Sequence, residues 1–231
     1  MIVDGEGTFV TQRTAPRLTG IDVAVDEERA ALVLSAPGQG ALRLALAPHE
    51  GENVRVKVWR DEVRALHAGE EAARWASAFL RAPASIVFMS DAVERPVRPD
   101  FAREGDHVSF ADAFPLLLTS VESLDDLNAR LDRPLPMDRF RPNVVVSGGL
   151  PWEEDEWRRA SVGPVPLRLP KGCNRCVVTT TDQLTGERGV EPLRAMATFR
   201  RRPDGKVYFG INAVPDARGT IAVGDPVTVL D

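Results

Sequence analysis

The stretch Cys173–Asp182, which reads Cys-Asn-Arg-Cys-Val-Val-Thr-Thr-Thr-Asp, is the most informative segment of this 231-residue chain. Two cysteines separated by two residues can form a redox pair, hold a metal, or pack as small buried thiols. A thioredoxin-type redox site needs a helix to begin at its first cysteine, whereas the β-branched run Val177–Thr181 favours a strand. The pattern therefore argues against redox exchange of the thioredoxin type.

Structural zinc is equally unexpected, because a tetrahedral zinc site needs four sulfur or imidazole ligands. The chain has two cysteines, and its three histidines, His49, His67 and His107, have no ligand-like spacing. What remains is a thiolate at the mouth of a strand beside Arg175, since a cationic neighbour lowers the pKa of a thiol. Such a soft ligand can bind a metal carried by a cofactor, and burial of both thiols as apolar side chains stays open as the alternative.

The composition narrows the class of protein. With 43% hydrophobic and 27% charged residues the chain is globular, and its net charge of −5 gives no field that attracts nucleic acid or an anionic membrane. No apolar run approaches the ~20 residues of a membrane span. Two cysteines without a signal-peptide pattern predict a reducing, cytoplasmic location.

The first half of the chain has the pattern of antiparallel strands. Met1–Val10 predicts a strand, a turn at Asp4–Gly7 and a second strand. An apolar stripe within Gly69–Ala82 predicts an amphipathic helix, which Pro83 ends. Alternating runs separated by turn residues predict further strands at Thr19–Val25, Ala31–Leu34, Ala41–Leu46, Val54–Trp59 and Ile86–Met89.

The proline-rich stretch Asp91–Gly105 has no apolar period, and we place a domain boundary there. Beyond it, helices are predicted at Ser123–Leu131, with Ser123 and Asp126 as an acidic capping box, and at Glu191–Phe199. The predicted strands are Asn143–Ser147, Val165–Leu169, Val177–Thr181, Val207–Ile211 and Pro226–Leu230. Short strands with few helices predict a mainly β fold of two β-rich subdomains, built as partly open barrels or sandwiches.

Three further segments carry charge. Arg139–Asn143 combines two guanidinium groups, which suit phosphate, with an amide that can read a heterocycle; ordinary surface charge is the alternative. The acidic run in Pro151–Trp157 predicts a solvated loop whose tryptophans pack inward, and Arg200–Arg202 predicts a solvated helix end.

Gly38-Gln39-Gly40 predicts a hairpin turn. The chain has no Walker loop, nucleophile elbow or recognisable triad.

Taken with Thr185-Gly186, Glu191–Leu193 and Gly224–Val227, the Cys173–Asp182 stretch resembles a MOSC domain, the family named after the C-terminal region of molybdenum cofactor sulfurase. The first half, through Val10–Arg13, Pro16–Leu18 and the helix with Trp75, resembles the β-barrel module that precedes MOSC in the mitochondrial amidoxime-reducing component and its bacterial relatives. The resemblance implies a β-barrel MOSC fold with domains 1–90, whose first strand is missing, and 91–231.

The resemblance also implies a site. In this family the second cysteine of the C-x-R-C motif ligates the molybdenum of a bound molybdopterin, so Cys176 would be both the metal ligand and the catalytic residue. The positions that match cofactor-binding ones are Asp112, Arg141, Asn143, Asn174, Arg175 and Cys176. The implied cofactor is Mo-molybdopterin; an iron–sulfur cluster is not encoded in this chain and pyridoxal phosphate is not expected.

The implied reaction is the reduction of a small N-hydroxylated substrate with electrons from a separate donor protein of the ferredoxin, flavodoxin or cytochrome type and its reductase. The alternative is a non-catalytic carrier of molybdenum cofactor, or of a persulfide on Cys176. Family members have a Lys-Ser strand and an Asp-Arg-x-Trp motif ahead of the segment matching Met1–Asp4. Their absence predicts a start further upstream, or a truncated chain that binds the cofactor weakly or not at all and is then an inactive barrel. The pattern assigns no role to Cys173.

Overall fold

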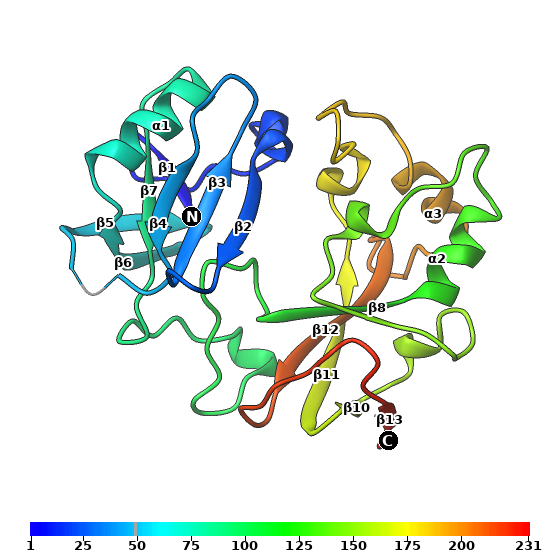
Figure 1. Ribbon diagram of the computed structural model, residues 1–231. Coiled ribbons are helices and arrows are strands. Elements are labelled where there is room, and N and C mark those ends of the chain that lie inside the picture. The colour runs from blue at the N-terminus through cyan, green and yellow to red at the C-terminus, as the bar shows by residue number, and fades with distance from the viewer. Residues whose placement is uncertain (49) are drawn as a thin grey trace. The chain divides into compact units, whose positions relative to one another are not determined.

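The computed structural model describes residues 1–48 and 50–231, so His49 lies outside the described residues. The chain forms two compact units, seen in Figure 1. Unit 1 comprises residues 1–95 and 181–188, and unit 2 comprises residues 96–180 and 189–231. Strands dominate both units, which confirms the mainly β fold class.

Unit 1 contains two antiparallel sheets, one of four strands in the order β1-β7-β6-β5 and one of three in the order β2-β3-β4. The strands are β1 (Ile2–Asp4), β2 (Asp22–Asp26), β3 (Ala31–Ser35), β4 (Leu42–Ala45), β5 (Asn53–Val58), β6 (Asp61–His67) and β7 (Ala84–Phe88). The predicted turn after β1 is present, because the Asp4 side chain accepts hydrogen bonds from the backbone N–H groups of Glu6 and Thr8, each at 2.9 Å. A short 3-10 helix, η1, covers Pro16–Gly20.

Helix α1 (Glu70–Leu80) covers the core of unit 1 and confirms the predicted amphipathic helix. Its buried side chains, Ala72, Trp75, Ala76 and Phe79, pack with Leu42 and other apolar residues of the sheets. The Trp75 indole N–H donates to the carbonyl of Gly40 at 2.6 Å, so the buried ring keeps its polar atom satisfied. The helix ends at Arg81, which adopts a left-handed conformation.

Unit 2 is built on a six-stranded sheet with the order β13-β10-β11-β12-β8-β9. All neighbours are antiparallel except β8 and β9, which run parallel. Leu118, Leu167, Leu169 and Ile211 are central in its core. The strands are β8 (Leu116–Ser120), β9 (Val144–Val146), β10 (Arg159–Val162), β11 (Val165–Asn174), β12 (Tyr208–Pro215) and β13 (Val227–Val229).

The two helices predicted in unit 2 are present, but their bounds differ from the predicted ones. Helix α2 (Val121–Asn128) begins earlier than predicted, because its cap is Ser120 and not Ser123: the Ser120 hydroxyl accepts a hydrogen bond from the backbone N–H of Ser123. Helix α3 covers Leu193–Phe199. Two 3-10 helices, η2 (Pro99–Phe101) and η3 (Met137–Phe140), lie in the connections.

The predicted strand at Val177–Thr181 is wrong, because Val177–Thr180 forms the 3-10 helix η5. The Thr179 backbone N–H and hydroxyl both donate to the carbonyl of Cys176, at 3.1 and 2.9 Å. The Thr180 hydroxyl donates in the same way to the carbonyl of Val177. Threonine hydroxyls that bond to nearby carbonyls offer the backbone an alternative to a sheet, and here this outweighs the β-propensity of the run.

The acidic run is not the solvated loop that its charge predicts. Glu153–Asp155 forms the 3-10 helix η4, and Glu154 is 0% exposed. The Glu154 carboxylate accepts hydrogen bonds from the Ser123 hydroxyl at 2.8 Å and the Ser120 hydroxyl at 3.1 Å. Trp157, at 9% exposed, packs inward as expected.

Arg200 is likewise not a solvated helix end. Its guanidinium forms an ion pair with Asp155 at 2.5 Å, and both side chains are largely buried. The same guanidinium lies over the Trp152 ring, 4.1 Å from its centroid. The two oppositely charged runs that the sequence places on the surface therefore pair with each other.

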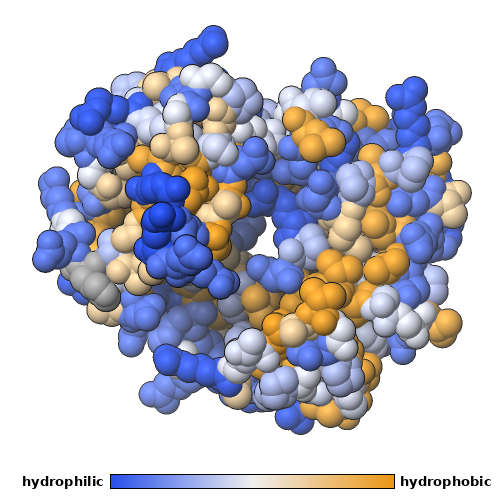
Figure 2. All heavy atoms as spheres, viewed as in Figure 1, coloured by the Kyte–Doolittle hydropathy of each residue, from blue (hydrophilic) through white to orange (hydrophobic). Residues whose placement is uncertain are grey.

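Hydrophilic residues predominate on the face drawn in Figure 2, with hydrophobic side chains gathered in smaller patches. Among residues 1–48 and 50–231, no helix is long and apolar enough to cross a membrane.

Candidate functional site

The C-x-x-C segment lies at the end of strand β11, not at the start of a strand. Asn174 is the last residue of β11 and is paired with Tyr208 of β12, after an irregularity in register between Gly172 and Asn174. The Arg175 backbone N–H donates to the carbonyl of Val207 at 2.8 Å, and the chain then turns through η5. Both cysteines are free thiols, partly accessible to solvent. The end of the strand therefore presents Cys173, Asn174 and Cys176 close to the surface of unit 2.

Arg175 connects this segment to the second motif that the sequence singled out. Its Nη1 donates to the Cys173 sulfur at 2.9 Å, and its Nη2 donates to the carbonyl of Phe140 at 2.7 Å. Phe140 is 0% exposed, and its ring stacks on Phe209 with 3.7 Å between centroids. The structure thus brings together the segments 139–143 and 173–176, which lie far apart in the sequence.

Arg141 follows η3 in a strained conformation, with φ of 53°. The left-handed region is unfavourable for a residue with a Cβ atom, and such outliers gather at functional sites. The side chain is exposed. Within the part of the chain that the structure describes, no hydrogen bond or ion pair engages the Arg141 guanidinium, so it presents an uncompensated positive charge.

Asn143 combines a side-chain oxygen that is bonded within the fold with an amide NH₂ group that remains available. Its side-chain oxygen accepts a hydrogen bond from the Leu117 backbone N–H at 2.9 Å, and its own backbone N–H donates to the Leu117 carbonyl. These bonds fix the approach of β9 to β8. The side chain is exposed, so its amide NH₂ remains available as a donor beside Arg141.

The electrostatics of Cys173 differ from the sequence expectation. Burial raises the pKa of the Cys173 thiol, and the Arg175 guanidinium offsets this increase only in part. The negative charge of Asp112 adds to the increase, which places that predicted site residue in the electrostatic environment of Cys173. At neutral pH Cys173 is therefore a thiol. The lowering of its pKa expected from Arg175 is smaller than the increase caused by burial.

Sequence reasoning missed a cluster around Tyr208, the residue of β12 that pairs with Asn174 at the end of β11. The Tyr208 hydroxyl donates to Asp204 at 2.6 Å, and Arg202 lies over the Tyr208 ring at 4.3 Å. Burial, followed by the hydrogen bond to Asp204, raises the pKa of Tyr208 to about 12. A Cβ atom on Gly172 would lie 3.1 Å from the Tyr208 ring, so glycine allows this close packing. Arg202, Asp204 and Tyr208 are close in sequence, and the pairing of β11 with β12 adds Gly172 to them.

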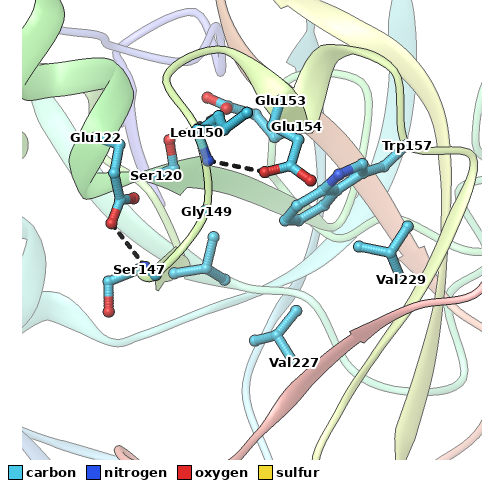
Figure 3. Close-up of a pocket in the computed structure, with 12 residues that line it drawn as sticks. Ser120, Glu122, Ser147, Gly149, Leu150, Glu153, Glu154, Trp157, Val227 and Val229 are labelled. Carbon is cyan, nitrogen blue, oxygen red and sulfur yellow. Dashed lines mark hydrogen bonds between the residues drawn. The ribbon is translucent and has the colours of Figure 1, made fainter.

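A surface cavity of about 230 Å³ lies elsewhere in unit 2 and is drawn in Figure 3. Ser120, Glu122, Glu154 and Trp157 are among the residues that line it. None of the six predicted site residues does so. One oxygen of Glu122 accepts from the Gly148 N–H, and one oxygen of Glu153 accepts from the Leu150 N–H, whereas Glu122 Oε2 and Glu154 Oε1 are buried without a partner among the described residues. The cavity is therefore separate from the arginine and cysteine cluster.

Comparison with known proteins agrees with the motifs that meet in unit 2. The chain matches the model of the MOSC domain over residues 105–228 and that of the MOSC N-terminal beta barrel domain over residues 1–83. The chain therefore belongs to the MOSC family.

Two mammalian proteins are similar along the whole chain. Mitochondrial amidoxime-reducing component 1 of Homo sapiens is 34% identical over 243 residues, covering 100% of this chain and 72% of the relative. The mouse protein of the same name is 34% identical, covering 100% of this chain and 71% of its own. A solution structure of a Bordetella bronchiseptica protein covers 46% of this chain and 75% of its own at 25% identity, with a TM-score of 0.35, too low to carry an argument.

Proposed function

We propose that this chain is an oxidoreductase that holds a molybdenum cofactor at Cys176 and reduces N-hydroxylated compounds such as amidoximes. The observation that carries the proposal is the contact of Arg175 with Cys173 and with the carbonyl of Phe140, which joins the cysteine segment to the segment of Arg141 and Asn143. Membership of the MOSC family and similarity to proteins named amidoxime-reducing components support the choice of cofactor and of substrate class.

The donor set fits an anionic, phosphate-bearing cofactor with a soft metal. Arg141 has an exposed guanidinium without a partner among the described residues, and the buried Nε–H of Arg175 has no hydrogen-bond acceptor. Guanidinium groups suit phosphate, and an amide such as that of Asn143 can contact a heterocycle. Thiolate sulfur is the protein ligand that soft metals favour, and Cys176 supplies it. The residues present therefore match the group in charge and in ligand type.

Each residue would contribute a defined part of the reaction. The bound cofactor would supply two-electron chemistry, which with two protons cleaves the N–O bond and releases water. Cys176 would ligate the metal, while Arg141 and Arg175 would offset the negative charge of the cofactor. Asn143, Asn174 and Asp112 would complete its polar surroundings. The electrons would come from a separate protein, as the similarity to amidoxime-reducing components implies.

The test is the molybdenum content of the full chain, purified from a host that makes the cofactor. Near-stoichiometric metal is expected in the parent protein, and Cys176→Ser should lose it while its circular dichroism and unfolding temperature match those of the cofactor-free parent. Reduction of benzamidoxime with a chemically reduced viologen as electron donor should be lost in the same variant. A Cys176→Ser protein that keeps its metal and activity would refute the ligand assignment.

A matched control separates the site from general surface charge. Arg133→Gln removes an exposed guanidinium in the same unit and should leave metal content and activity unchanged. Metal bound in full without any turnover of amidoximes or hydroxylamines would instead favour the carrier function.

We also propose that the protein acts in the cytoplasm. Both cysteines are free thiols, as expected in a reducing compartment. The mammalian relatives are mitochondrial by name, so fractionation of the native cells with an antibody against this chain is the direct test. Enrichment in an organelle or membrane fraction would overturn the assignment.

A further inference from the structure

The sequence pattern left Cys173 without a role. In the structure its sulfur is partly buried and contacts Arg175 Nη1 at 2.9 Å, a short distance for a nitrogen and a sulfur. Among residues 1–48 and 50–231, the other hydrogen bond of the sulfur is long, 4.0 Å to the carbonyl of Asn174. The guanidinium is therefore the main polar partner of this thiol.

The guanidinium of Arg175 is anchored at two points. A guanidinium is planar, so one contact leaves it free to rotate, whereas contacts at both terminal nitrogens fix its plane. Cys173 holds Nη1 and the carbonyl of Phe140 holds Nη2. The Phe140 anchor is itself rigid, since that residue is 0% exposed and stacks on Phe209. With both anchors in place, the remaining N–H groups of Arg175 have fixed directions.

The same contact reaches Arg141. The carbonyl that accepts from Arg175 Nη2 belongs to Phe140, whose peptide unit leads directly into the strained backbone of Arg141, with φ of 53°. A guanidinium that rotates away from Phe140 would release this carbonyl. Cys173 thus acts on both arginines, through Arg175 on one side and through the Phe140 peptide on the other.

We propose that Cys173 is a positioning residue, whose sulfur orients the Arg175 guanidinium for the anionic part of the cofactor. This inference rests on the proposed function. Cys173 does not ligate the metal and takes no part in the chemistry. Its contribution is to keep the cofactor bound, as polar groups that orient the immediate ligands of a metal centre do.

The test measures release of the cofactor, not activity. The loaded full-length protein is diluted, and molybdenum and fluorescent oxidised pterin are followed in the protein fraction over time. Cys173→Ala removes the acceptor, and we expect release about 10-fold faster, at the lower end of the effects of such orienting residues. Cys173→Ser keeps an acceptor and should stay closer to the parent rate. Cys173→Val keeps the volume without the acceptor and should resemble Cys173→Ala.

A double-mutant cycle distinguishes positioning from loss of packing. In an Arg175→Gln background, Cys173→Ala should cause no further acceleration, because the group it orients is absent. Equal acceleration with and without Arg175, or release at the parent rate from both Cys173→Ala and Cys173→Val, would overturn the inference. If Cys173→Ala does not fold, Cys173→Val and Cys173→Ser decide the question in the same way.

Failure of the proposed function would give a different result. Cys176→Ser is measured in parallel, and full metal retention in that variant, or no metal in the parent, refutes the proposed function and the inference with it. Loss of metal in Cys176→Ser together with unchanged release in the Cys173 variants refutes the inference alone.

Discussion

Two regions of unit 2 contain buried polar groups, and the atom left unpaired is a donor in one region and an acceptor in the other. Around Arg175 the donors exceed the acceptors: its Nε–H is unpaired, and the nearby Arg141 guanidinium is exposed without a partner in the described chain. Around Glu154 two serine hydroxyls from the start of α2 donate to Oε2, while the buried Oε1 has no partner among the described residues. The first region has positive charge to spare for a ligand, whereas the second uses its hydrogen bonds to hold a helix and a loop together.

The comparison shows that burial of charge alone does not mark a site. Glu154 is 0% exposed and its pKa is raised, mainly by burial, as the pKa values of many catalytic carboxyl groups are. Its carboxylate nevertheless lies in a network with Ser120 and Ser123, and one of these serines caps α2. The cluster at Arg175 differs because its unused donors lie beside exposed residues from two distant motifs.

The largest expected effect is a loss of stability at Phe140, which joins Arg141 and Arg175 to the hydrophobic core. Phe140→Ala removes a fully buried ring that stacks on Phe209, and it should lower the free energy of unfolding by about 3–5 kcal/mol. Urea denaturation followed by fluorescence measures this change. A loss below about 1 kcal/mol would mean that the cluster does not rest on a packed core.

The next prediction tests whether Arg141 binds a ligand without stabilising the fold. Arg141→Gln should leave the urea midpoint of the cofactor-free protein unchanged, because no described residue bonds to this guanidinium. Retention of molybdenum should fall by about 10- to 100-fold. Metal analysis after dialysis measures it, with Arg133→Gln as the matched control. Equal retention in both variants would remove Arg141 from the site.

How far the sequence predicted these regions depends on how local their contacts are. Helix α1 was predicted because its apolar stripe and Pro83 are adjacent in the chain. The strand predicted at Val177–Thr181 failed because threonine hydroxyls bond to nearby carbonyls. Arg175 was identified through its motif, but its contact with Phe140 depends on the tertiary fold. The partners of Glu154 lie more than 30 residues away in sequence, so its charge predicted exposure.

A smaller effect concerns the pH dependence at Glu154. Its folded-state pKa is raised above the ordinary value of 4.5, so the folded protein binds this proton more tightly than the unfolded chain. The stability from this group is full below pH 4.5 and is lost as the pH rises through the raised value. Glu154→Gln cannot ionise, and the free energy of unfolding should therefore fall less between pH 4 and pH 7 in the variant than in the parent. Parallel pH profiles of parent and variant would contradict the assignment.

The smallest expected effect is on the titration of Tyr208, the single tyrosine of the chain, which lies beside the cysteine segment. Because the chain has one tyrosine, alkaline titration of its ultraviolet absorbance reads Tyr208 alone, and the midpoint should lie near 12. Asp204→Asn weakens the acceptor of the phenol and removes a nearby negative charge, so the midpoint should move toward 10 while burial keeps it above that value. Since the folded-state pKa is raised, the stability from Tyr208 is full below pH 10 and is lost as the pH rises through 12. A midpoint of 10 in the parent protein would show that Tyr208 is solvated, and that the packing of β12 against Gly172 is looser than the structure has it.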